Sequence, residues 1–259
     1  MATRTKKKSG KHFKWALIIF LFFAIAAIYG GYEWWKIRRS RFVHYPAFGI
    51  SIPEEYMIHG IDVSKYQQTI SWESVKEMKV NNIQLGFAFI KATEGIENTD
   101  PQFKRNWKKS KQAGVIRGAY HFFLATKDGR AQAENFIEAV DLEKGDLPPV
   151  VDVEQTYGVS IAILKKELKE WLDVVEFNYG VKPIIYTNVD FYSRNLGNEF
   201  NGYPLWAAHY YQYDTPRIER NWDFWQHSEE GRVNGILSKV DFNVFNGDSL
   251  QFKSILMAK

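Results

Sequence analysis

A long uncharged stretch stands out near the start of the chain. From Trp15 to Tyr32 there are 18 uncharged residues, dominated by Leu, Ile, Phe and Ala. As a helix rising about 1.5 Å per residue, this stretch would be roughly 27 Å long, which just crosses the hydrocarbon core of a bilayer. Six Lys and Arg residues precede it and four follow it, and Trp34 and Trp35 suit the aromatic belt at a membrane surface. The pattern predicts a single-pass transmembrane helix.

This helix divides the chain. The expected parts are a basic cytoplasmic flank, a transmembrane signal anchor, a short tether and a folded domain, at residues 1–14, 15–35, 36–58 and 59–259. Two alternatives stay open. The small residues of Ala24-Ile25-Ala26 are typical of a signal-peptide cleavage site, in which case the domain would be secreted. A buried helix of a soluble protein would rarely follow so many cations. Whether the segment is an anchor or a cleaved signal peptide, the domain works on the far side of the membrane.

From His59 onward, apolar runs of strand length alternate with helical segments, which indicates repeated βα units and a largely parallel sheet. The expected strands are Gly60–Val63, Leu85–Ile90, Val115–Phe123, Pro149–Val153 and Pro183–Thr187. The expected helices are Ser71–Val80, Pro101–Ala113, Arg130–Val140 and Ser160–Tyr179.

The last third of the chain changes character. Strand-like runs recur at Tyr203–His209, Asp223–His227 and Val240–Phe245, but the intervals between them are too short or too Gly-rich for full helices. No Pro/Gly/Ser linker divides residues 59–259. We therefore predict one α/β domain, an irregular (β/α)8-like barrel of the TIM type, with about five βα units followed by three strands with few helices.

Charge and composition narrow the chemistry. There is no cysteine, which excludes disulfide scaffolds, thiolate zinc sites and cysteine nucleophiles. Residues 1–51 hold 10 Lys and Arg against one acid, which leaves 24 basic against 29 acidic residues in 52–259. A net acidic domain argues against nucleic-acid binding. No Gly-rich nucleotide loop and no G-x-S-x-G elbow is present, so we expect no cofactor.

The most informative motif is Pro148-Pro149-Val150-Val151-Asp152-Val153-Glu154, an apolar run that ends in two acids. Side chains two positions apart lie on the same face of a strand, so Asp152 and Glu154 should both point into the barrel at its catalytic end. Two neighbouring carboxyls cannot both ionise freely, so one can stay protonated while the other is charged. Glycosidic bond cleavage requires one proton-donating and one anionic partner of this kind. The alternative is a solvated pair that caps the next loop.

Two further acids lie on the first and last expected strands. Asp62 and Asp241 could join Asp152 and Glu154 at one mouth, because the first and last strands of a closed barrel are neighbours. A lone Asp at the end of a strand is also common as a turn or helix cap.

Aromatic and imidazole side chains complete the candidates. Tyr120, Tyr186 and Trp206 fall on or just after expected strands, and such rings stack on sugars, although core packing is the usual role of aromatic residues. His121 and His209 lack the spacing of known metal motifs. We therefore expect them to be satisfied core or pocket histidines, and we predict no metal.

From about Ile58 to Phe245 the sequence resembles the glycoside hydrolase family 25 muramidases, the lysozymes of the Chalaropsis type. The resemblance rests on Gly60-Ile61-Asp62-Val63-Ser64 with Tyr66-Gln67, Phe89-Ile90-Lys91-Ala92-Thr93-Glu94-Gly95, Gly118-Ala119-Tyr120-His121-Phe122, Asp152-Val153-Glu154, Ile185-Tyr186-Thr187-Asn188, Pro204-Leu205-Trp206-Ala207-Ala208, Trp225-Gln226 and Val240-Asp241-Phe242-Asn243. A departure is His227, where the family often has Tyr.

The resemblance implies hydrolysis of the β-1,4 bond between N-acetylmuramic acid and N-acetylglucosamine in peptidoglycan, with net retention. It implies that Glu154 is the general acid and then base, and that Asp152 steadies an oxazolinium ion formed by the 2-acetamido group. Asp62 and Asp241 match the other two acids of the family site, and Tyr120, Tyr186 and Trp206 match aromatic positions beside the groove. We expect a monomer whose partners are glycan strands and the membrane.

Two other functions remain open at this stage. One is a chitinase-like barrel glycosidase that uses the same D-x-E pair. The other is a membrane-tethered wall-binding module without catalysis, although all four acids are present.

Overall fold

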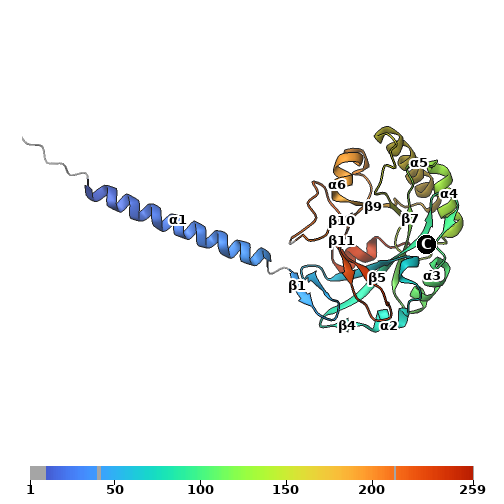
Figure 1. The fold of residues 1–259 in the computed structure, drawn as a ribbon, viewed down its shortest axis with the longest axis horizontal. Coiled ribbons are helices and arrows are strands. Elements are labelled where there is room, and N and C mark those ends of the chain that lie inside the picture. The colour runs from blue at the N-terminus through green and yellow to red at the C-terminus, as the bar shows by residue number, and fades with distance from the viewer. Residues whose placement is uncertain (1–9, 40–41, 213, 259) are drawn as a thin grey trace, which may run out of the picture.

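The computed structural model describes residues 10–39, 42–212 and 214–258 (Figure 1). Residues 1–9 of the predicted basic flank and residues 40–41 of the predicted tether lie outside this description. Helix α1 (Gly10–Arg39) extends away from the rest of the chain. Within it, Lys14–Trp35 is long and apolar enough to span a membrane, and none of that window is buried. A signal sequence near the N-terminus shares these properties.

The folded domain is a closed barrel. In the described part of the chain, eight strands form it: β3 (Ile58–Val63), β5 (Ile83–Glu94), β7 (Ile116–Phe122), β8 (Val150–Asp152), β9 (Ile184–Asn188), β10 (Leu205–Ala208), β11 (Phe224–Gly231) and β12 (Val240–Phe245). All neighbours from β3 to β11 are parallel. Strand β12 runs antiparallel to both β11 and β3 and so closes the ring. The predicted irregular barrel is confirmed.

Helices cover the first part of the barrel and thin out later, as the sequence pattern predicted. The outer helices are α2 (Trp72–Glu77), α3 (Phe103–Gln112), α4 (Gly129–Ala139) and α5 (Ile161–Tyr179). Between β9 and β10 the described chain forms only the short turns α6 (Val189–Phe191), η2 (Tyr192–Leu196) and η3 (Asn198–Phe200). Two short strands, β4 (Lys79–Val80) and β6 (Asn98–Thr99), pair with β5, and η1 (Lys65–Gln67) follows β3.

Helix α5 shows how local sequence sets these bounds. The Ser160 hydroxyl accepts a hydrogen bond from the Ile163 amide at its start, and Gly180 ends it with φ of 71°, a left-handed conformation that glycine adopts without strain. Its buried residues recur at helical spacing and pack on the barrel; they are Leu164, Leu168, Trp171, Leu172 and Val175.

The last helix closes one end of the barrel. In α7 (Ser249–Ser254), Phe252 packs on the rings of Phe87, Phe224 and Phe245. Phe224 opens β11 and Phe245 ends the antiparallel β12, so this is the end where the parallel strands begin. The carboxyl ends of those strands remain open at the other end of the barrel.

The predicted tether needs a correction. Phe42–Tyr45 (β1) and Ile50–Pro53 (β2) form an antiparallel hairpin that belongs to the folded domain. Phe48 and Ile52 are fully buried, and the Phe48 ring packs against the Phe242 ring of β12 with ring centres 5.3 Å apart. The segment therefore gains more from burying its apolar side chains than it would from staying extended in water.

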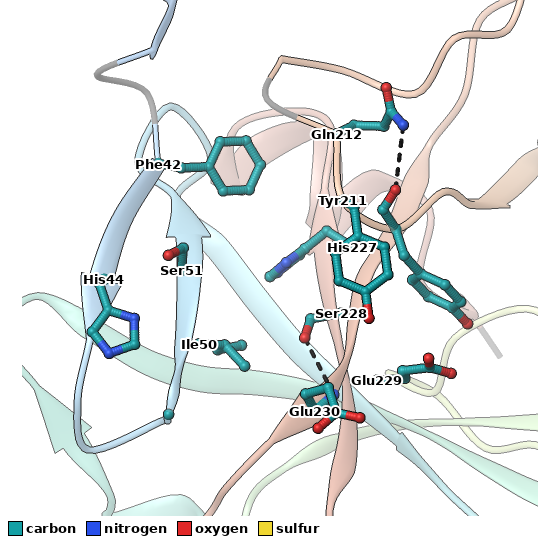
Figure 2. Close-up of a pocket in the computed structure, with 12 residues that line it drawn as sticks. Phe42, His44, Ile50, Ser51, Tyr211, Gln212, His227, Ser228, Glu229 and Glu230 are labelled. Atoms are coloured by element: carbon teal, nitrogen blue, oxygen red, sulfur yellow. Dashed lines mark hydrogen bonds between the residues drawn. The ribbon is translucent and has the colours of Figure 1, made fainter.

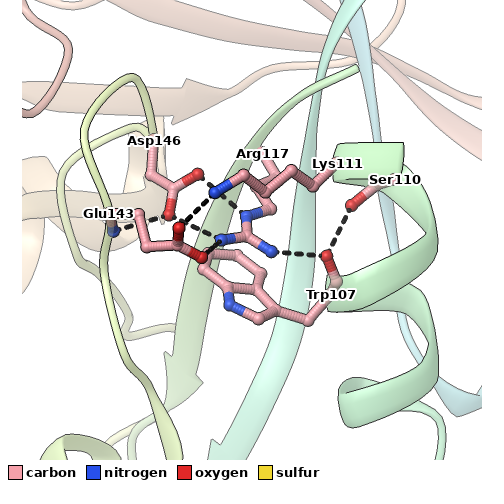
Figure 3. A network of polar contacts seen from close by, with 6 residues as sticks. All are labelled: Trp107, Ser110, Lys111, Arg117, Glu143 and Asp146. Carbon is pink, nitrogen blue, oxygen red and sulfur yellow. Dashed lines mark hydrogen bonds and ion pairs between the residues drawn. The ribbon is translucent and has the colours of Figure 1, made fainter. Parts of the chain in front are cut away.

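A buried ion pair stabilises the closed end of the barrel (Figure 3). The Arg117 guanidinium donates to Asp146 Oδ1 at 2.8 Å and to Glu143 Oε1 at 2.9 Å, and it lies 3.9 Å from the centre of the Trp107 ring. Arg117 is only 2% exposed. This contact links β7 to the loop that precedes β8, and β8 carries Asp152 and leads directly to Glu154.

We expect Arg117→Met to lower the free energy of unfolding by about 3–5 kcal/mol, because it leaves the Asp146 carboxylate buried without its partner. The control is Arg194→Met, which removes the exposed Arg194–Asp190 pair. That change should cost no more than about 1 kcal/mol. Urea unfolding measures both, and equal effects would contradict this account of the buried network.

Candidate active site

Successive side chains of β8 point to opposite faces of the sheet and therefore lie in two different environments. Val151 and Val153 join the apolar layer between strands and helices, whereas Val150 packs inside the barrel with rings such as Phe89. Asp152 therefore points inward, as Val150 does. The Val153 amide donates to the Tyr186 carbonyl at 3.0 Å, which extends the pairing of β8 by one residue and keeps Glu154 on the inner face.

The inner face opens into a cleft of about 460 Å³ at the carboxyl ends of the strands. Every candidate site residue named from the sequence lines it: Asp62, Tyr120, Asp152, Glu154, Tyr186, Trp206 and Asp241. They come from six different strands or the residues directly after them. The loop-cap alternatives for Asp62 and the Asp152–Glu154 pair are therefore not what the structure shows, although the roles of these residues remain predictions.

Asp62 and Asp241 face each other across the junction that closes the barrel, at paired positions of β3 and β12. Gln226 and Asn243 both donate to Asp62 Oδ2, at 2.8 and 2.7 Å. Burial raises the pKa of Asp62 to about 6, although these amide donors pull it down. Burial and then the Asp62 charge raise the pKa of Asp241 to about 9, so Asp241 holds a proton that it shares with Asp62.

Asp152 and Glu154 are also acids whose ionisation is coupled. Burial is the main cause that raises the pKa of Glu154, while a hydrogen bond from Tyr186 and the charge of Lys91 lower it. Burial and then the Glu154 charge raise the pKa of Asp152. Asp152 Oδ1 is buried, and no residue in the described part of the chain forms a hydrogen bond with it. Because both pKa values are raised and each carboxylate opposes the charge of the other, the pair loses its two protons less readily than two free acids would.

These acids predict how stability depends on pH. An acid whose pKa is raised in the fold stabilises it at low pH and loses that contribution as pH rises. Above pH 7 the buried His59, His121 and His227, whose pKa values burial lowers, are neutral in both states and add no slope. From pH 7 to 9, Asp241 should therefore lower the free energy of unfolding by about 1 kcal/mol per pH unit.

Urea unfolding at pH 7, 8 and 9 tests this slope. The variant Asp241→Asn should flatten it, whereas Asp173→Asn, at an exposed position of α5, should not. A stability that stays constant or rises over this range in the unmodified chain would contradict the shared proton.

Two of the three aromatic candidates are largely buried, and the sugar-binding role of all three stays a prediction. Trp206 stacks on Phe89 with ring centres 4.3 Å apart, and it is 2% exposed. Tyr186 is also buried, and its hydroxyl donates to Gln226 at 2.8 Å. Both rings therefore form the floor of the cleft and do not offer an open stacking face. Tyr66, which is exposed, is a better placed wall residue that the sequence analysis did not select.

Lys91 is another residue of the cleft that the sequence analysis missed as a site residue. Its ammonium pairs with Glu94 at 2.6 Å and lies 4.4 Å from the centre of the Phe122 ring. It is the only Lys or Arg among the described residues that line the cleft. The alternation of side chains along β5 could have identified it. Lys91 follows Phe87 and Phe89 at two-residue spacing, and these two side chains point into the barrel.

The histidines take other roles. His121 is fully buried and hydrogen-bonds Thr93 and Gln132, and His209 accepts from the Arg217 amide. His227, the departure from the family pattern, points away from the cleft, because Gln226 takes the inward position next to it.

One acidic group could in principle hold a cation. The carboxylates of Asp128, Glu167 and Glu170 lie within 4.8 Å of one another near the surface. Asp128 and Glu167 already accept backbone amides of α4, and Glu170 pairs with Arg130. These contacts account for the group without an ion.

Comparison with known families supports the same interpretation. The model of the family described as glycosyl hydrolases family 25 matches residues 61–236. The protein YegX of Escherichia coli (strain K12) is 50% identical over 201 residues, which cover 78% of this chain and 74% of the relative. Lysozyme M1 of Streptomyces globisporus is 33% identical over 219 residues, which cover 76% and 71%.

Solved structures agree. A family 25 glycosyl hydrolase from Bacillus anthracis superposes with a TM-score of 0.72 at 32% identity, covering 78% of this chain and 95% of that one. A bacterial lysozyme from Streptomyces coelicolor superposes with a TM-score of 0.68 at 32% identity, covering 76% and 96%.

Proposed function

The chain belongs to glycosyl hydrolases family 25 and is an enzyme of the lysozyme or muramidase type; we propose that it cleaves the β-1,4 bond between N-acetylmuramic acid and N-acetylglucosamine with Glu154 as general acid and base. The supporting observation is that four acids, three on β3, β8 and β12 and the fourth two residues after β8, line one cleft at the open end of the barrel. Peptidoglycan is the substrate of such enzymes.

The proposed first step breaks the glycosidic bond. The protonated Glu154 donates its proton to the leaving oxygen, while the carbonyl oxygen of the 2-acetamido group attacks C1 and forms an oxazolinium ion. Asp152 is the anionic partner. No described residue donates a hydrogen bond to its Oδ1, so the acetamido N–H can occupy that position and stabilise the charged carboxylate in the transition state.

The proposed second step restores the enzyme. The Glu154 carboxylate takes a proton from water, which attacks C1 from the side that the leaving group vacated. The bond between C1 and the acetamido oxygen breaks, its electron pair restores the neutral acetamido group, and the configuration at C1 is retained. Asp62 and Asp241, which share a proton beside this site, would hold the sugar through that hydrogen bond donor and acceptor.

Product analysis tests the proposal. Mass spectrometry of fragments released from purified peptidoglycan should find N-acetylmuramic acid at the reducing end, and proton NMR of the first products should find the β-anomer. Chitin should stay intact. Release of reducing-end N-acetylglucosamine, cleavage of chitin alone, or binding without release would each contradict it.

We also propose that α1 is a single-pass membrane anchor that places the barrel outside the cytoplasm. The large apolar residues of its central stretch, such as Phe20 and Ile28, are exposed, which is unfavourable in water. Only residues 36–41 separate the candidate span from the hairpin, a reach of at most about 22 Å. If the segment is instead cleaved, the domain is secreted.

Two truncations test the anchor and the hairpin separately. A chain of residues 42–259 should leave the membrane fraction, with kcat/KM on isolated peptidoglycan unchanged. A chain of residues 58–259 should be less stable by more than about 4 kcal/mol, because it strips Phe48 and Ile52 from the core. Fractionation and urea unfolding measure these outcomes; a full chain that stays soluble would contradict the anchor.

A further inference from the structure

A second cavity, of about 550 Å³, lies between the β1–β2 hairpin and β11 (Figure 2). Its hairpin wall precedes residue 61, where the family match begins. Tyr210 and Glu229 line both this cavity and the catalytic cleft, so the two adjoin at these side chains. A substrate held in the cleft therefore has a second binding surface directly beside it.

The walls of this cavity are held in place without a ligand. Phe48 packs on Phe242, and the Arg232 amide donates to the Phe48 carbonyl at 2.9 Å. Ile50, which lines the cavity, is only 6% exposed. Because the hairpin is anchored by these contacts, the cavity does not have to form when a ligand arrives.

His227 carries unsatisfied hydrogen-bonding capacity into the cavity. Its ring projects from β11 toward the hairpin in Figure 2, and the residue is 5% exposed. Both ring nitrogens are buried, and neither has a hydrogen-bond partner among the residues that the structure describes. Burial lowers the pKa of His227 to about 3, so the ring is neutral and offers one donor and one acceptor. This combination matches an amide, which offers one N–H and one C=O.

The charged side chains at the edge of the cavity determine which charge on a ligand is favoured there. Glu229 and Glu230 are exposed at the edge of the cavity, and Glu230 pairs with Lys239. No Lys or Arg is among the described residues that line it. An ammonium group is therefore favoured there over a carboxylate or phosphate.

We propose that this cavity binds the peptide stem carried by the muramic acid units of the glycan strand. The inference rests on the proposed function, because the stem branches from a sugar held in the cleft. Such a stem combines amides for His227, alanine methyl groups for Phe42 and Ile50, and the ammonium group of a diamino acid for Glu229. A bare sugar ring offers hydroxyl groups and one acetamido group, but no cation and no alanine methyl groups.

Two variants of the full chain test the proposal by kinetics. His227→Phe removes both ring nitrogens with little change of shape, and Ser51→Trp fills the cavity from β2. Ala47→Trp adds the same bulk at an exposed turn position of the hairpin that does not line the cavity. Each is assayed on peptidoglycan with intact stems and on the same strands after an amidase has removed the stems.

On stem-bearing strands, kcat/KM should fall by about fivefold for His227→Phe and at least about tenfold for Ser51→Trp, with no change on stripped strands or for Ala47→Trp. Equal losses on both substrates would overturn the proposal, since the cavity would then bind sugar or support the barrel. No loss on either would also overturn it.

A binding measurement separates this inference from the proposed function. Calorimetry of the full chain in detergent with a muramoyl tripeptide that ends in a diamino acid should detect binding that Ser51→Trp weakens and that the peptide-free sugar lacks. If the unmodified chain cuts neither substrate, the proposed function fails, and this binding result alone decides the stem site. Absence of binding would then overturn it.

Discussion

Replacing Glu154 with Gln should lower kcat on purified peptidoglycan by about 10³-fold or more, because the amide has no proton to donate to the leaving oxygen and cannot later activate water. Glu154 lies two residues after the end of β8, lines the cleft and is close enough to the Tyr186 hydroxyl for that group to lower its pKa. Gln keeps the shape of the side chain, so KM should change little.

The control for this variant is Glu219→Gln, which makes the same change at an exposed position outside the cleft. Release of reducing ends measures activity, and pull-down with insoluble peptidoglycan measures binding. Activity of Glu154→Gln within a factor of two of the unmodified chain would remove Glu154 from the mechanism. Loss of binding together with activity would indicate that the variant had damaged the cleft.

The second large effect is expected from Asp152→Asn, which should lower kcat by about 10² to 10³-fold. An amide cannot provide the negative charge that stabilises the oxazolinium ion. The same change should stabilise the fold at pH 8, because the pKa of Asp152 is raised and its charged form is a cost that grows with pH. At pH 4 the gain should be small, since the carboxyl is then protonated in the fold.

This opposite movement of activity and stability distinguishes a catalytic acid from a structural one. Reducing-end assays and thermal unfolding at pH 4 and 8 give the two readouts, and Asp173→Asn at an exposed site of α5 is the matched control. If the melting temperature of Asp152→Asn fell in step with its activity, Asp152 would be holding the barrel together. The proposed role in catalysis would then be abandoned.

Residues whose environment depends on their neighbours along the chain were predictable. The apolar run before Asp152 placed that residue and Glu154 on one inward face, because successive side chains of a strand point to opposite sides. The absence of helical periodicity after Thr187 likewise predicted that the final strands would be bare. Asp62 and Asp241 could be linked only by assuming that the barrel closes, and the antiparallel β12 supplies that closure.

Other features depend on partners far away in the sequence. Residues 36–58 were predicted to be a tether because they begin with basic residues and then hold Pro46 and Pro53. The partners of the hairpin within this segment, Phe242 and Arg232, come about 190 residues later in the sequence. In the same way, nothing near Trp206 shows that Phe89 covers its ring. Thus the type and order of strands, and the acids on them, follow from the linear pattern. The cavity walls, the covered rings and the proton shared by Asp62 and Asp241 exist only once distant strands have packed, because burial and charge coupling arise between side chains in space.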